Sequence, residues 1–264
     1  MKKIYKKTLL SLLLLHLLHF CFSQTIDSSI QNIDSARETI ESEAKTEHFS
    51  GALSVTSNGI SVIPTFTLGK PAAIVNMSIS KGKFSFEPDL RFSLDGKPWN
   101  FLFWFRYKLL TAERFHINIG AHPAFAFSSV PATKNGVTKN VLTTQHYVGT
   151  EIAPGYSLSR KVSIGTYYLY GKGIEKDALK NVHFIALNSS FSNVKISNKF
   201  LGSVSPQVYY LNIDGQEGFY FSSAFSIARK NLPLSASLFF NKTIHSNITG
   251  NKNLVWNATL TYSF

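Results

Sequence analysis

Charged side chains in this sequence recur at every second residue within segments that are otherwise apolar. Because successive side chains of an extended strand point to opposite faces, the members of one series are expected to share a face. Groups of both signs on one face can pair with each other or select charged solutes. The candidate residues for this chemistry are Glu87, Asp89, Arg91, Arg106, Lys108, Arg114, His116, His122 and Glu151.

Two pairings follow from the order of these residues along the chain. If the connection at 95–98 sets the pairing of its flanking strands, Glu87 lies opposite Arg106, and on the next hairpin Lys108 lies near His116. The same face is expected to carry three more cations, which makes seven against three acids: Lys161, Lys195 and Lys199. Two interpretations stay open, a basic constriction that favours small anionic solutes and a salt-bridged plug that mainly stabilises the fold.

Motifs for metal or cofactor binding are missing from the sequence. His116 and His122 share a face but are about 20 Å apart along one strand, too far to bind one ion. There is no Gly-rich phosphate loop, nucleotide fingerprint or paired-cysteine motif. We therefore expect no cofactor and no metal.

The N-terminus has the layout of a cleaved signal peptide over residues 1–23. Four lysines precede an apolar run from Leu9 to Leu18, and a polar end follows. Cys21 is preceded by the bulky Phe20, which argues against a lipoprotein cleavage site. Residues 24–59 are expected to form a polar periplasmic linker and a short hairpin arm, because 51–57 alternate and Asn58-Gly59 is a strong turn.

From residue 60 onward the hydrophobic pattern has a period of two, which is typical of strands with one apolar face. In the last strand, Leu254, Trp256 and Leu260 alternate with Asn257 and Thr259. The pattern predicts about twelve strands, most of them long enough to cross a bilayer when tilted. They are expected at 60–68, 72–80, 83–94, 99–110, 113–127, 143–158, 160–171, 181–191, 195–212, 217–229, 232–243 and 253–264.

The polar face distinguishes a soluble β-protein from a membrane barrel. Only 16% of the residues are charged, and the face opposite the apolar one is mostly Ser, Thr, Asn, Gly and Ala. Small polar residues suit a crowded lumen, and aromatic residues near the strand ends suit a membrane interface. The connections alternate between tight turns and longer loops, as an up-and-down barrel requires, with long loops at 128–142, 172–180 and 244–252.

The C-terminal strand resembles the terminal strand signal of Gram-negative outer-membrane β-barrel proteins. It reads Trp256-x-Ala258-x-Leu260-x-Tyr262-x-Phe264. This resemblance implies an all-β, antiparallel, up-and-down transmembrane barrel over residues 60–264, located in the outer membrane. It also implies that Trp256, Tyr262 and Phe264 serve as the signal for the barrel-assembly machinery, with outer-membrane lipids and lipopolysaccharide as further partners.

These features favour a narrow passive pore with a basic, salt-bridged lumen. The alternative is a plugged structural or surface-binding barrel without transport. A remote alternative is an outer-membrane lipid hydrolase, but His245-Ser246-Asn247 lacks the spacing and the Tyr of that enzyme's motif. We expect a protein that is not an enzyme, and no nucleic-acid partner for an exported chain despite the net charge of +12.

Overall fold

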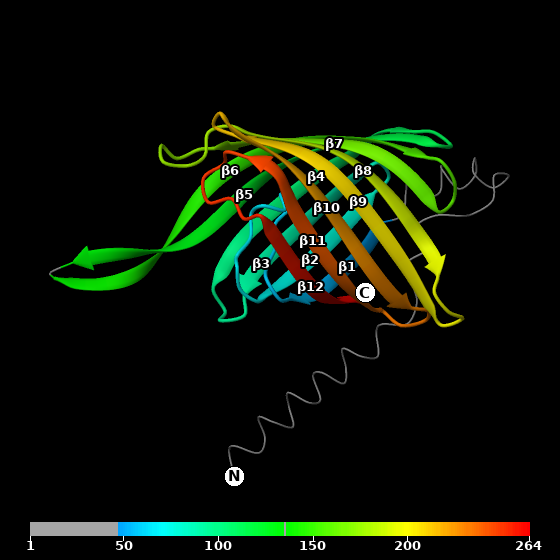
Figure 1. Ribbon diagram of the computed structural model, residues 1–264, viewed down its shortest axis with the longest axis horizontal. Helices are drawn as coiled ribbons and strands as arrows, with labels where there is room; N and C mark the ends of the chain where they lie inside the picture. The colour runs from blue at the N-terminus through cyan, green and yellow to red at the C-terminus, as the bar shows by residue number, and fades with distance from the viewer. Residues whose placement is uncertain (1–46, 135) are drawn as a thin grey trace, which may run out of the picture.

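Twelve antiparallel strands form one closed barrel (Figure 1). The computed structural model describes residues 47–134 and 136–264; the signal peptide and the linker predicted up to residue 46 lie outside this range. Within the described range, no helix has the length and apolarity needed to cross a membrane. The strands are β1 (Glu47–Thr56), β2 (Ala72–Lys81), β3 (Phe84–Ser93), β4 (Pro98–Thr111), β5 (Phe115–Lys134), β6 (Val137–Ser157), β7 (Val162–Gly173), β8 (Val182–Lys195), β9 (Phe200–Ile213), β10 (Gln216–Arg229), β11 (Leu234–Ser246) and β12 (Leu254–Ser263).

Alternation along each strand separates an apolar exterior from a mixed interior. On β4 the inward Trp104 is 2% exposed, whereas its neighbour Phe105 is 45% exposed on the outside. The same outward exposure of large apolar side chains is found all round the barrel, as at Ile185 on β8, Val208 on β9 and Leu238 on β11. An apolar exterior on a closed sheet matches a lipid environment, because the sheet leaves no strand edge unpaired in the bilayer.

The first strand is not the predicted one. Residues 60–68 were expected to span the membrane, but β1 does so instead, pairing with β2 on one side and β12 on the other. Residues 60–68 belong to a loop closed on itself by the isolated bridge between Ile60 and Thr67. Pro64 lies at the middle of this segment and cannot donate a ladder hydrogen bond. The strand count stays at twelve because β1 replaces the lost strand, so 47–56 are barrel and not linker or arm.

The connections divide the barrel into two ends, which we call the turn end and the loop end. The turn end has the connections 82–83, 112–114, 158–161, 196–199 and 230–233, and the loop end has 57–71, 94–97, 135–136, 174–181, 214–215 and 247–253. In barrels of this kind the short turns and both termini face the periplasm. One turn differs from the prediction: β8 continues past Ser192-Asn193 through a bulge and ends at Lys195.

The predicted long loop 128–142 is also largely strand. β5 and β6 continue pairing until Lys134 and Val137 meet beside the turn. They form a two-stranded ribbon that projects well beyond the barrel (Figure 1). Residues such as Val130, Thr133 and Val141 favour extended backbone, which explains why a polar segment read as a loop remains a hairpin.

Candidate functional site

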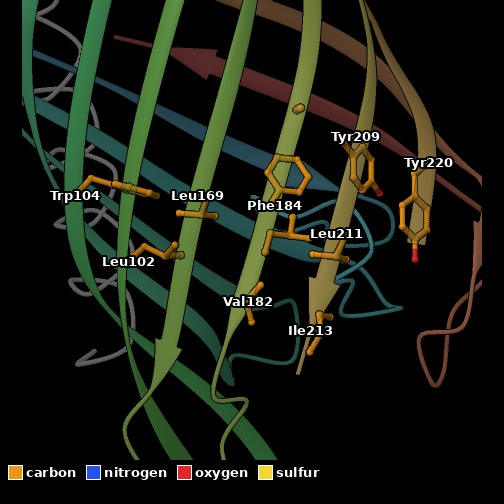
Figure 2. Close-up of a cluster of buried hydrophobic side chains, with 11 residues drawn as sticks. Leu102, Trp104, Leu169, Val182, Phe184, Tyr209, Leu211, Ile213 and Tyr220 are labelled. Atoms are coloured by element: carbon orange, nitrogen blue, oxygen red, sulfur yellow. The ribbon is translucent and has the colours of Figure 1, made fainter. Parts of the chain in front are cut away.

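The interior of the barrel near the loop end is filled by an apolar cluster, which we call the apolar cap. Figure 2 shows its side chains projecting from β4, β7, β8, β9 and β10 into one shared space. Tyr209 and Tyr220 stack with ring centroids 4.8 Å apart. The members of the cap are Ile63, Leu102, Trp104, Leu169, Val182, Phe184, Ala186, Tyr209, Leu211, Ile213 and Tyr220.

The loop 57–71 contributes to the cap from within the barrel mouth. Ile63 is 6% exposed and belongs to the cluster. The loop is also held by polar contacts, since an Arg91 guanidinium nitrogen donates to the carbonyl of Ile60 and Asn100 donates to the Ser61 hydroxyl at 3.4 Å. The loop between the first two strands therefore folds inward and narrows the mouth.

Below the cap, Arg106 is the centre of an ion network in the middle of the barrel. Its Nε donates to Glu151 Oε1 at 2.5 Å, and its Nη1 donates to Glu87. Tyr167 donates to the other Glu151 oxygen at 2.5 Å, and Ser85 donates to Glu87 at 2.6 Å. One guanidinium thus joins carboxylates from β3 and β6, and each carboxylate has a second donor.

The predicted contact between Glu87 and Arg106 is present, but the register is different. In the ladder Glu87 pairs with Trp104, and Arg106 pairs with Ser85, so the ion pair is diagonal. The pairing shifts because β3 and β4 are joined by the tight connection 94–97 and carry a bulge after Arg91. Long side chains still reach a diagonal partner.

A second ion pair lies within a single strand. Arg91 donates to both carboxylate oxygens of Asp89, at 2.8 and 2.6 Å. The two side chains are only 9% and 11% exposed, and the guanidinium lies 5.7 Å from the Trp99 ring centroid. Arg91 therefore uses its neighbour on β3 rather than an acid on another strand.

The remaining predicted residues do not join the ion network. His122 is buried against Trp104, with ring centroids 3.8 Å apart, and His116 faces Gly155, where a Cβ would overlap its ring. Lys108 pairs with Asn118 in the ladder, so it is not opposite His116. Arg114 lies exposed in the turn 112–114.

The charge balance in the middle of the barrel is accordingly not basic. Two cations, Arg91 and Arg106, meet three carboxylates, Asp89, Glu87 and Glu151. The other five cations of the sequence count are exposed and lie towards the turn end. Lys108 donates its amide to the Lys83 carbonyl beside the first turn, and the remaining four lie at or beside the turns: Arg114, Lys161, Lys195 and Lys199.

Sequence reasoning missed Trp104 and Tyr167 as parts of this site. Trp104 is a member of the apolar cap that also contacts the ion network. The Arg106 guanidinium lies over its ring, 4.2 Å from the centroid, and His122 packs against it. Trp104 is flanked by Phe103 and Phe105, and Tyr167 has Tyr168 on one side, so a period of two could not show which aromatic side chain points inward. Only a charged neighbour at i+2, as Arg106 is to Trp104, marks the inward face.

The three residues of the proposed assembly signal lie on the exterior of β12 or directly after it. Trp256 is 57% exposed and Phe264 is 42% exposed. The Phe264 ring lies beside Tyr262 and Phe49, with centroids 6.3 and 6.1 Å away. Backbone hydrogen bonds in both directions between Gly51 and Phe264, at 2.7 and 2.9 Å, close the barrel there.

Comparisons with known proteins identify the fold. No family model and no curated protein matches this sequence. An outer membrane channel from Pseudomonas putida F1 matches 92% of this chain and 100% of its own, with a TM-score of 0.50 and 10% identity. The KdgM porin matches 81% and 99% with a TM-score of 0.49 and 7% identity, and OmpT, an outer membrane protein of Vibrio cholerae, matches 84% and 98% with a TM-score of 0.40 and 10% identity. Together with the apolar exterior, the fold is that of an outer-membrane β-barrel, and the protein lies in the outer membrane.

Proposed function

We propose that this protein is a narrow passive channel whose mouth at the loop end is closed by the loop 57–71 in the conformation described. The observation that carries the proposal is the exposure of Glu87 and Arg106, each 29% accessible within a closed barrel. A fully packed core would leave such an ion pair dry, at a high desolvation cost. Accessible charges in the middle of the barrel favour a water-filled lumen.

The wall towards the turn end supports the same function. Inward hydroxyls pair across neighbouring strands, as Ser203 with Ser226 at 2.6 Å and Ser54 with Thr261 at 2.9 Å. Small hydrogen-bonding side chains leave space and offer water and polar solutes alternative partners. Because three carboxylates face two guanidinium groups at mid-height, the proposed preference is for cations and neutral solutes, not for anions.

The hydrogen bonds of Ser246 fit a transport role better than a hydrolase. Ser246 is the serine in the part of the sequence that was compared with a lipid hydrolase motif. Ser246 is hydrogen-bonded to the Tyr220 hydroxyl at 2.9 Å and accepts from the Ile248 amide at 3.1 Å. The next residue, Asn247, accepts from the Glu217 amide at 2.6 Å. These contacts fold the 247–253 loop, so we infer a structural role for His245-Ser246-Asn247 and no enzymatic activity for the protein.

A second candidate function is a plugged barrel without transport. The apolar cap favours it, because Ile63 and the large side chains around it remove water from the outer half of the interior. The two functions differ in whether the loop 57–71 can leave the mouth.

Conductance in planar bilayers separates the two. We expect small discrete steps for the full protein and several-fold larger steps when residues 61–66 are replaced by Gly-Gly, because Ile63 and the contact of Ser61 are removed. A matched control shortens the ribbon by deleting 130–133 and 138–141, which pair with each other outside the barrel, and should conduct like the full protein. If neither the protein nor the 61–66 variant gives steps, the barrel is plugged.

A further inference from the structure

Exposed cations encircle the turn end of the barrel. Every one of the five turns carries at least one at or beside it, and we call the set the turn-end ring. Its nine members are Lys81, Lys83, Arg114, Arg160, Lys161, Lys195, Lys199, Arg229 and Lys230, all of them exposed. The five turns follow one another round the barrel from β2 to β11, so the ring surrounds this end except at the seam of β12 and β1 and is not a patch on one side.

The height of the ring is fixed by where the strands begin. In four of the five turns a cation directly precedes the first residue of the next strand: Lys83 before β3, Arg114 before β5, Lys161 before β7 and Lys199 before β9. Three of these strands begin with an exposed aromatic residue: Phe84, Phe115 and Phe200 are 48%, 37% and 37% exposed. The cations therefore lie just beyond the edge of the apolar exterior, where aromatic side chains mark a membrane interface.

In the part of the chain that the structure describes, the ring carries far more positive charge than the acids at this end can neutralise. Among the described residues, the side-chain carboxylates at the turn end are Glu47 and Glu113. Glu47 pairs with Lys81 at 3.0 Å, and no other ring member has a carboxylate within salt-bridge distance in the described part of the chain. At the loop end, in contrast, acids are mixed with the lysines, and Lys70 pairs with Asp95 at 2.9 Å.

We propose that the turn-end ring binds the phosphate groups of anionic phospholipids in the membrane leaflet at that end. A circle of cations at constant height matches a shell of lipid headgroups better than it matches a single docked protein. Lys and Arg at such a position keep their stems against the apolar surface and extend the charge to the headgroup level. Each cation near an anionic membrane surface contributes attraction that salt screens.

Lipid selectivity at the protein surface tests this proposal. The full-length mature protein is reconstituted in phosphatidylcholine vesicles with spin-labelled phosphatidylglycerol or spin-labelled phosphatidylcholine, and the motionally restricted fraction of each label is measured. We expect about a fivefold preference for phosphatidylglycerol, the size of one favourable headgroup contact. In 1 M salt, where the screening length is about 3 Å, the preference should largely disappear.

Two variants of equal charge locate the effect. The turn-end variant changes one cation in each turn to Gln: Lys83→Gln, Arg114→Gln, Lys161→Gln, Lys199→Gln and Lys230→Gln. The control changes five exposed lysines at the loop end: Lys97→Gln, Lys139→Gln, Lys172→Gln, Lys176→Gln and Lys242→Gln. The preference should fall towards one in the turn-end variant and persist in the control. Equal affinity of the unmodified protein for both lipids, or an equal loss in both variants, would overturn the proposal; the salt dependence of the unmodified protein decides the matter even if a variant does not fold.

Discussion

At the scale of single residues, Arg106 holds the middle of the barrel together. Its two carboxylate partners are in different environments, because the Glu151 side chain is 2% exposed and that of Glu87 is 29% exposed. A buried charge that loses its partner is costly, whereas an accessible one is solvated by water. The two acids therefore differ in how much they depend on the same guanidinium.

This difference predicts an order of stabilities. Glu151→Gln should lower the free energy of unfolding by about 3 kcal/mol, and Glu87→Gln by about 1 kcal/mol. Arg106→Gln leaves both acids without the guanidinium and should be the most harmful. Urea unfolding of the protein in lipid vesicles, followed by tryptophan fluorescence, measures all three, with the exposed Lys139→Gln as a neutral control.

Double variants test the same order more strictly. Adding Glu151→Gln to Arg106→Gln should recover most of the loss, because the remaining Glu87 is accessible to water. Adding Glu87→Gln instead should recover little, since Glu151 stays buried and charged. Equal recovery by the two double variants would show that the burial difference has no energetic effect.

At the scale of elements, the pattern of period two was sufficient for eleven of the twelve strands and for the alternation of turns and loops. It failed at the first strand for a physical reason. Residues 60–68 are apolar because Ile63 packs into the apolar cap, and the sequence cannot distinguish that burial from contact with lipid. β1 starts with Glu47, His48 and Ser50, so only its second half alternates clearly.

The candidate site was predictable to a similar extent. Charges at every second position showed which residues of β3 and β4 face inward, and the contact of Glu87 with Arg106 followed. The pair within β3, Arg91 with Asp89, was not predictable, because it depends on a side chain folding back along its own strand. A period of two gives the face on which a residue lies but not its position along the barrel axis. The lysines beside the turns were therefore counted in the lumen.

A proline scan can establish which segment is the first strand. Val55→Pro removes a backbone donor from the part of β1 that pairs with both β2 and β12. It should destabilise the barrel by about 3 kcal/mol or more and prevent its closure. Val62→Pro lies in the loop, where the bridge joins Ile60 to Thr67 instead, and should fold. Heat-modifiable migration on a denaturing gel reports the folded barrel. If Val62→Pro prevented folding and Val55→Pro did not, residues 60–68 would be the first strand.

At the scale of the whole molecule, closure depends on the contact between the first and the last strand. β1 and β12 pair over five residues on each side, from Ala52 with Ser263 to Thr56 with Thr259. Beyond this ladder, Gly51 and Phe264 exchange two backbone hydrogen bonds, and the Phe264 ring covers Gly51 so closely that a Cβ would overlap it. Phe264 could thus act in two ways, through its backbone in closure and through its ring in assembly.

The two roles of Phe264 are separated by comparing folding in vitro with assembly in cells. Phe264→Ala keeps the backbone hydrogen bonds, so the purified variant should refold into vesicles nearly as well as the unchanged protein. If the exposed ring is part of the signal for the assembly machinery, the same variant should reach the outer membrane several-fold less in cells. Phe200→Ala is the matched control, because Phe200 is an aromatic residue of similar exposure, 37% against 42%, at the same end of the barrel. Equal outer-membrane levels for Phe264→Ala and Phe200→Ala would show that Phe264 acts in barrel closure and not in the assembly signal. A refolding defect in vitro would show that its ring is needed to join β1 to β12.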